Sequence, residues 1–104
     1  MEINDQNVSG VLSQDKPVLL DFWASFCAPC LRLSPIIEEI GKEMKDKAIV
    51  GKVDTEADNT IELVQKYSIR NIPTIFIIKG GEIKEKIVGL TSKDNILEKL
   101  NKYI

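Results

Sequence analysis

Four apolar segments along the chain are typical of β-strands. Val18–Trp23 and Thr74–Ile78 are almost continuously apolar, as in strands that are covered on both faces of a sheet. Ala48–Val53 is a third strand segment. Glu82–Val88 follows the turn signal Gly80-Gly81 and carries three consecutive charged residues, which favours an antiparallel strand at the edge of the sheet.

Apolar residues at helical spacing predict four helices around these strands. One helix is expected to start near Asp5, and a long helix directly after the first strand. Two more are expected to start near Asp58 or Asn59 and near Thr91, where Asp94 completes a capping signal. The residues expected on their buried faces are Val8, Val11 and Leu12; Leu33, Ile36, Ile37, Ile40 and Met44; Ile61, Val64 and Tyr67; and Ile96, Leu97, Leu100 and Ile104.

This order of elements predicts an α/β fold. Strands that are joined through helices are expected to be parallel, and the hairpin adds an antiparallel strand. The result is a central mixed sheet of four to five strands flanked by helices on both faces, with a weakly signalled fifth strand at Glu2–Asn4. The length of 104 residues predicts a single domain, residues 1–104.

Composition excludes several classes of protein. The chain has no histidine, which excludes Ser-His-Asp triads, Cys-His proteases and Cys₂His₂ zinc fingers. The formal net charge is −2 and the lysines are interleaved with acidic residues, so we expect no nucleic-acid partner. No apolar run approaches the ~20 residues of a membrane-spanning helix, so we expect no membrane partner. The first residues lack the features of a signal peptide, so we expect a cytoplasmic protein.

The two cysteines, Cys27 and Cys30, stand three apart where the first strand passes into the long helix. A thiolate at a helix N-terminus is stabilised by the free N–H groups and the helix dipole, so it becomes reactive. Pro29 fits the first helical turn, and Cys27 at the tip should be more exposed than Cys30. A disulfide across so short a loop stabilises a fold little. Half of a zinc site, or a pair of inert core cysteines, also remains open at this point.

Asp21 and Pro73 are the other unusual residues. Asp21 interrupts an apolar strand and shares a face with Leu19 and Trp23, so burial would raise its pKa and suit it to be a general base. It could equally be a solvated aspartate at a strand end, or one that pairs with Lys52. Pro73 belongs at the start of its strand, and the pattern alone favours a trans bond before it.

Together, five segments of the sequence resemble the thioredoxin family, in the family's order and from about residue 5 to the C-terminus. The matching segments are Asp21-Phe22-Trp23-Ala24 with Cys27-x-Pro29-Cys30, Pro35, Lys52-Val53-Asp54, Ile69-Arg70-Asn71-Ile72-Pro73-Thr74, and Lys79-Gly80-Gly81-Glu82 with Val88-Gly89.

The resemblance implies the thioredoxin fold and roles for particular residues. The catalytic residues would be Cys27 as nucleophile, Cys30 as resolving cysteine, Asp21 as a buried carboxylate beneath Cys30, and Lys52 as its neighbour. Cys27 and Cys30 would form the redox-active disulfide, and the bond between Ile72 and Pro73 would be cis. The substrate surface would consist of Trp23, Ala28, Pro29, Ile72, Pro73 and Gly89, although Gly89 also fits an ordinary turn.

The resemblance also implies an activity, the reduction of protein disulfides by dithiol–disulfide exchange. The partners would be disulfide-containing proteins and a thioredoxin reductase, with no cofactor or metal in the chain and a monomeric state. The sequence departs from the commonest pattern at Ala28, Phe26 and Leu31, where Gly, Trp and Lys are usual, so the redox potential stays open. A disulfide oxidase or isomerase and a non-catalytic binding subunit are the alternative functions.

Overall fold

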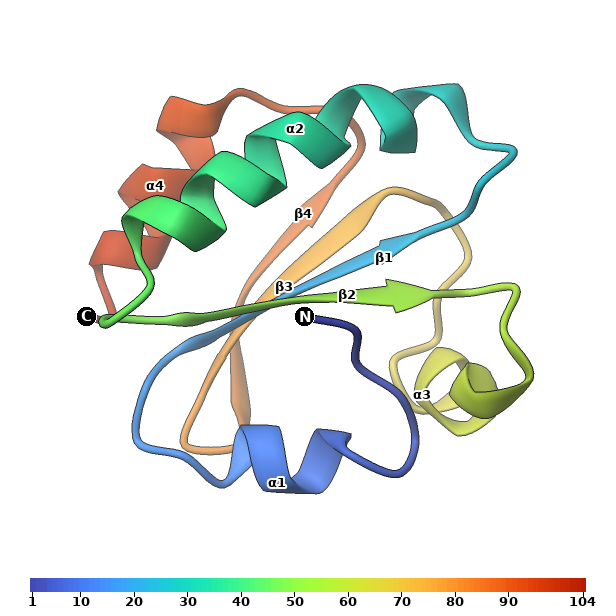
Figure 1. The fold of residues 1–104 in the computed structure, drawn as a ribbon, viewed down its shortest axis with the longest axis horizontal. Coiled ribbons are helices and arrows are strands. Elements are labelled where there is room, and N and C mark those ends of the chain that lie inside the picture. The colour runs from blue at the N-terminus through green and yellow to red at the C-terminus, as the bar shows by residue number, and fades with distance from the viewer.

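A four-stranded mixed sheet runs through the middle of the molecule, with helices on both faces (Figure 1). The structure is a computed structural model and describes residues 1–104. The strands are β1 Val18–Trp23, β2 Ile49–Asp54, β3 Thr74–Lys79 and β4 Glu82–Val88. The helices are α1 Val8–Leu12, α2 Ala28–Glu43, the short 3₁₀ helix η1 Asp58–Thr60, α3 Ile61–Lys66 and α4 Lys93–Asn101. The predicted α/β fold with a central mixed sheet is confirmed.

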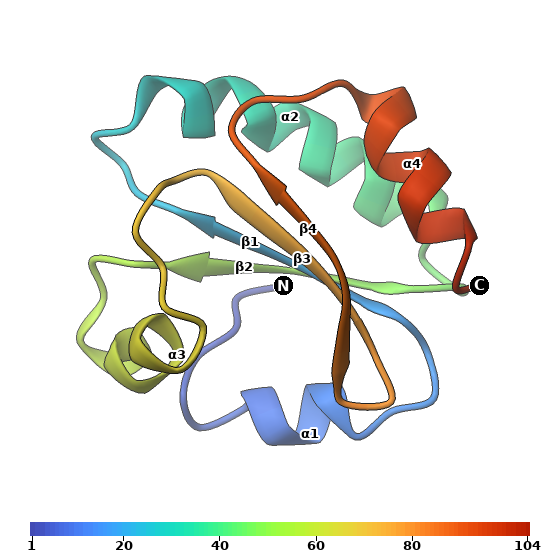
Figure 2. The same ribbon diagram turned by 180° about the vertical axis from the view of Figure 1, so that it is seen from behind.

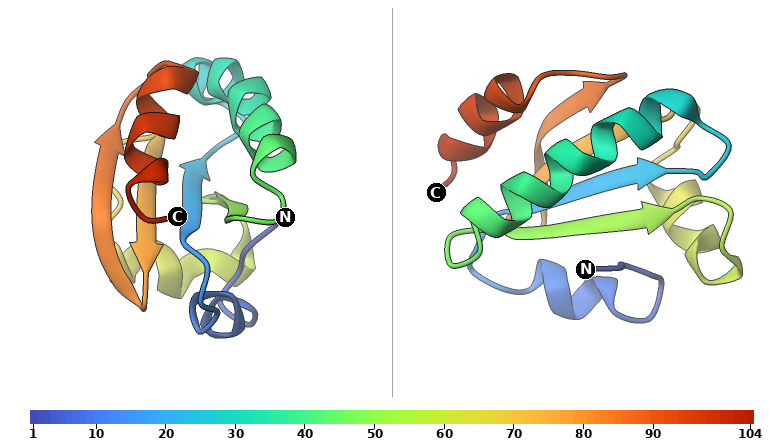
Figure 3. Two further views of the ribbon diagram at one scale, coloured as in Figure 1. Left: turned by 90° about the vertical axis from the view of Figure 1, so that its left-hand side faces the viewer. Right: turned by 45° about the horizontal axis from the view of Figure 1, so that its top comes forward.

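Helices α2 and α4 cover one face of the sheet, and α1 and α3 cover the other (Figures 2 and 3). Side chains alternate between the faces along β1, as they do in any strand. Leu19 packs with α2 and α4 in one core, and Leu20 and Phe22 belong to the second core on the opposite face. Burial on both faces explains why β1 is almost continuously apolar, and it makes the charge of Asp21 exceptional. None of the helices has the length and apolar character that crossing a membrane requires.

The strand order is β2-β1-β3-β4, which puts β4 at the predicted edge. β1 and β2 are parallel, but β3 is antiparallel to β1, so the expectation that all strands joined through helices are parallel was wrong. The reason is the length of α3, whose six residues span about 9 Å, whereas a six-residue strand spans about 20 Å. The chain therefore re-enters the sheet from the end at which β2 stopped. This reversal brings the start of β3 to the end of β1, beside the cysteines.

Three details of the elements also differ from prediction. In α3 the buried residue is Leu63, and Ile61 is exposed. Ile104 lies beyond the end of α4 and is exposed. The N-cap of α4 is Ser92, whose side chain accepts from the Asn95 N–H, because the helix begins one residue later than expected.

In place of the weakly signalled fifth strand at Glu2–Asn4, the structure has a single β-bridge between Glu2 and Lys52.

Candidate active site

Cys27 is the N-cap of α2, directly after the short turn that leaves β1. Its Sγ accepts from the backbone N–H of Cys30 at 3.2 Å, and Pro29 lies in the first turn of the helix. The sulfurs of Cys27 and Cys30 are bonded to each other as a disulfide, with Cα atoms 5.2 Å apart. When the pair is reduced, the same N–H and the helix N-terminus favour negative charge on the Cys27 sulfur.

The two cysteines are covered to different degrees. Cys27 is 8% exposed and Cys30 is 1% exposed, so the order of exposure agrees with the prediction, although Cys27 is also largely buried. Both pack in a small cluster with Ala24, against Trp23 and Ile72. The Cys27 Sγ lies 3.8 Å from the carbonyl oxygen of Ile72, so the backbone just before β3 contacts the disulfide.

Pro73 and Gly89 lie at the same end of the sheet as the cysteines. The bond between Ile72 and Pro73 is cis, as the resemblance implies and the general pattern does not. The carbonyl oxygen of Pro73 accepts from the N–H of Gly89 at 2.8 Å, which ties the end of β4 to the start of β3. Gly89 has a φ of +92°, a conformation that glycine adopts without strain.

Asp21 is fully buried on β1, on the face that α2 covers. Neither carboxyl oxygen has a hydrogen-bond partner. Burial raises the pKa of Asp21 from 3.8 to about 6, and the positive charge of Lys52 limits the rise. The alternative of a solvated aspartate at a strand end is therefore wrong. A carboxyl with this pKa can both hold and release a proton near neutral pH.

Lys52 is the register partner of Asp21 on β2, but the two side chains form no hydrogen bond. The Lys52 Nζ donates to the Ser34 Oγ at 2.6 Å and lies 4.6 Å from the centre of the Trp23 ring. The ammonium is thus held by α2 and by an aromatic face, and it acts on Asp21 only through its field. Ser34 was missed in the sequence, although its position four residues after Cys30 puts it on the same side of α2.

Four exposed apolar residues adjoin the site residues in the sequence but were not predicted as site residues. Phe26 and Leu31 flank the cysteine pair, and Val88 and Leu90 flank Gly89; these residues are 74%, 50%, 54% and 47% exposed, respectively. Their position next to the motif residues was the signal that could have found them. Neither cysteine lines any of the cavities of the molecule, so the disulfide does not lie in a pocket.

Comparison with known proteins places this geometry in context. A family model described as Thioredoxin matches residues 1–102. A protein named Thioredoxin from Rickettsia bellii is 47% identical over 94 residues, covering 90% of this chain and 88% of the relative. One of the same name from Chlorobaculum thiosulfatiphilum is 40% identical over 104 residues, covering 99% of this chain and 94% of the relative. Thioredoxin M-type, chloroplastic, from Spinacia oleracea is 38% identical over 107 aligned positions, covering 99% of this chain and 58% of the relative.

Proposed function

Because the chain belongs to the thioredoxin family and has the cysteine pair of a protein-disulfide reductase, we propose a division of work between its two sulfurs. Cys27 is the nucleophile and Cys30 is the resolving cysteine. The observation that carries this proposal is the N-cap position of Cys27, whose sulfur receives a backbone N–H while Cys30 is covered by its neighbours.

The exchange proceeds in two steps. The Cys27 thiolate attacks one sulfur of a substrate disulfide, and the other substrate sulfur leaves as a thiolate. Cys30 then loses its proton and attacks the Cys27 sulfur, which breaks the mixed disulfide and releases the second substrate thiolate. The released thiolates take up protons, and the enzyme is left as the Cys27–Cys30 disulfide, so two electrons pass to the substrate.

We assign to Asp21 the role of accepting the Cys30 proton, with Lys52 as the charge that tunes it. The pKa of about 6 supports this role, because a carboxyl that is partly protonated near neutral pH can take a proton and return it. The absence of any hydrogen-bond partner supports it further, since a structural carboxylate at full burial is normally paired.

Substrate is proposed to bind over the apolar surface around the disulfide. The predicted contact residues are Trp23, Ala28, Pro29, Ile72, Pro73 and Gly89. Two exposed neighbours of the cysteines, Phe26 and Leu31, are proposed to extend this surface on the α2 side, and Leu90, next to Gly89, on the other side. An open apolar surface suits a folded or extended protein substrate better than a small molecule.

We propose that the 104 residues act as one domain and one monomer, in the cytoplasm, without a bound cofactor or metal. A disulfide reductase must be returned to its dithiol form, which a reducing compartment favours. The electron donor is proposed to be a thioredoxin reductase, the partner expected for the family. Nucleic acids are not expected partners, since the net charge is −2 and the lysines are interleaved with acidic residues; a membrane is not an expected partner, since no apolar run approaches the ~20 residues of a spanning helix.

A disulfide-reduction assay with insulin as substrate tests the proposal. The protein with both cysteines should be active, and Cys27→Ser should abolish turnover and covalent capture. Cys30→Ser should abolish turnover but still form the mixed disulfide once per molecule. Activity that survives Cys27→Ser would overturn the assignment. A reduction potential well above that of the glutathione pool would indicate an oxidase or isomerase instead.

A further inference from the structure

We propose that Ser34 is a positioning residue, whose hydroxyl holds the Lys52 ammonium between Trp23 and α2 so that its charge acts on Asp21 during proton transfer. The kinetic consequence rests on the base role proposed for Asp21, but the positioning itself does not.

The contacts of Lys52 carry this inference. The side chain has one hydrogen-bond acceptor, the Ser34 Oγ at 2.6 Å, and one aromatic contact, the Trp23 ring at 4.6 Å. A short hydrogen bond from an ammonium is stronger than a neutral one, so the hydroxyl fixes the end of a flexible side chain. Without an acceptor at this position, the face of the Trp23 ring would be the one remaining contact that holds the ammonium in its present place.

Lys52 is also the only charge that acts appreciably on Asp21. The register partner of Asp21 on β3 is the apolar Ile75, and Cys27 and Cys30 at the start of α2 carry no charge while they are bonded to each other. The field of Lys52 is the one charge effect on the Asp21 carboxyl, and it opposes burial. A change in the position of the Lys52 ammonium should therefore change the pKa of Asp21.

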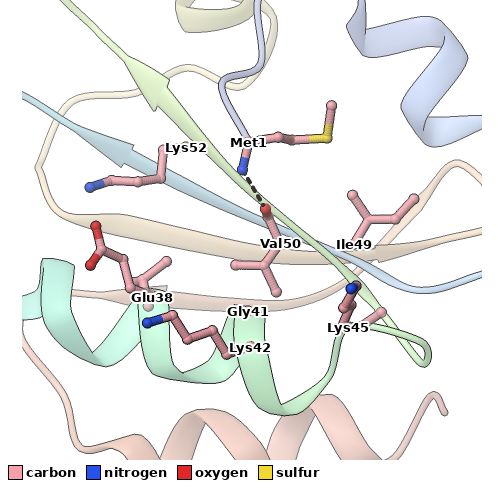
Figure 4. Close-up of a pocket in the computed structure, with 10 residues that line it drawn as sticks. Met1, Glu38, Gly41, Lys42, Lys45, Ile49, Val50 and Lys52 are labelled. Carbon is pink, nitrogen blue, oxygen red and sulfur yellow. Dashed lines mark hydrogen bonds between the residues drawn. The ribbon is translucent and has the colours of Figure 1, made fainter.

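A competing site for the Lys52 ammonium lies in a solvent-exposed groove between α2 and β2. Lys52 lines one end of a groove of about 480 Å³ between α2 and β2, and Glu38, one turn beyond Ser34, lines the same groove (Figure 4). Glu38 is exposed and Asp21 is not, so pairing with Asp21 would require both charges to lose their water. Without the Ser34 hydroxyl, the ammonium should therefore turn outward to water and Glu38, away from Asp21.

The direct test is a titration of the Asp21 carboxyl by ¹³C NMR in the oxidised protein, which needs no activity. For Ser34→Ala we expect the pKa of Asp21 to rise from about 6 to about 7, because an opposite charge within reach typically lowers the pKa of a carboxyl by 1 or more. Ser34→Thr keeps a hydroxyl and should restore the original value. In a Lys52→Met background, Ser34→Ala should change nothing further, since its effect passes through Lys52.

The second readout is the pH profile of mixed-disulfide resolution, measured by release of substrate in single-turnover experiments. We expect the profile of Ser34→Ala to move upward by the same amount as the pKa of Asp21. An unchanged or lowered pKa, or a rise that persists in the Lys52→Met background, would overturn the positioning role. A raised pKa with an unmoved rate profile would keep that role for Ser34 and would instead reject Asp21 as the base.

Discussion

The replacement Asp21→Asn should stabilise the folded protein at neutral pH and have little effect at pH 4. The pKa of Asp21 is raised in the folded state, so the folded protein holds this proton more tightly than the unfolded chain does. Below the unfolded pKa of 3.8 both states are protonated, and the carboxyl causes no loss. As pH rises, the unfolded chain ionises first, and folding stability falls until the pH exceeds the folded pKa.

The size of this effect follows from the two pKa values. The folded pKa of about 6 exceeds the ordinary value of 3.8 by about 2, and each pKa unit corresponds to 1.36 kcal/mol, so the full loss of stability is about 3 kcal/mol above pH 7. At pH 4, close to the ordinary pKa, the same two values give a loss of less than about 1 kcal/mol. Because Asp21 is fully buried, solvent screening does not reduce these figures much. Asparagine has a similar shape and no charge to bury, so it removes the pH-dependent loss.

Urea denaturation of the oxidised protein at pH 4 and pH 7.5 measures this difference. The difference in unfolding free energy between Asp21→Asn and the unchanged protein should grow by about 2–3 kcal/mol between the two pH values. The comparison between pH values cancels any packing difference of the amide. As a control, Asp46→Asn removes an exposed aspartate from a turn and should show no such growth. A stability difference that stays constant, or that turns against Asp21→Asn at pH 7.5, would refute the raised pKa.

Three further results are expected. Cys30→Ser should accumulate a stable mixed disulfide with substrate, which mass spectrometry would detect. In the reduced protein, the rate of Cys27 alkylation by iodoacetamide against pH should give a pKa below that of free cysteine. Preferential labelling of Cys30 would contradict the assignment. Ala28→Gly should raise the reduction potential by about 20 mV, because glycine costs up to about 1 kcal/mol more to order in the helical turn that the disulfide fixes, and equilibration with a glutathione buffer measures it. Phe26→Asp should raise KM for protein substrates about tenfold through loss of apolar contact, whereas Ile83→Asp, at the opposite end of the sheet from the cysteines, should leave KM unchanged.

The strands and the long helix could be predicted because their patterns are local. An apolar run such as Val18–Trp23 and the stripe from Leu33 to Met44 report burial directly. The direction of β3 could not be read in this way, since it depends on how far the chain travels between β2 and β3. The shortness of α3 decides it, and boundaries in the segment from Asp58 to Lys66 are blurred by the 3₁₀ turn that precedes the helix.

The site residues, too, could be predicted where the signal is local and could not where it depends on the assembled sheet. Cys27, Cys30 and Asp21 stand out in the sequence because each conflicts with its surroundings or forms a motif. Ser34 gives only a weak signal, its position four residues after Cys30, because a half-buried serine in a helix is ordinary until the side chain opposite it is known. Its importance comes from the register of Asp21 with Lys52 across two strands, which only the assembled sheet reveals.

The unpaired state of Asp21 explains why activity and instability should share one cause. A carboxylate that accepted hydrogen bonds or a direct ion pair at this depth would be stable when charged, and its pKa would fall below the range in which it could hold a proton. A carboxyl with no charge nearby would stay protonated well above neutral pH. The structure lies between these limits, because the Lys52 ammonium is near enough to lower the pKa of Asp21 yet is hydrogen-bonded to Ser34 instead. A substitution that relieves the burial of charge at Asp21 must therefore also remove the proton acceptor proposed for Cys30, and stability gained there should come with slower resolution.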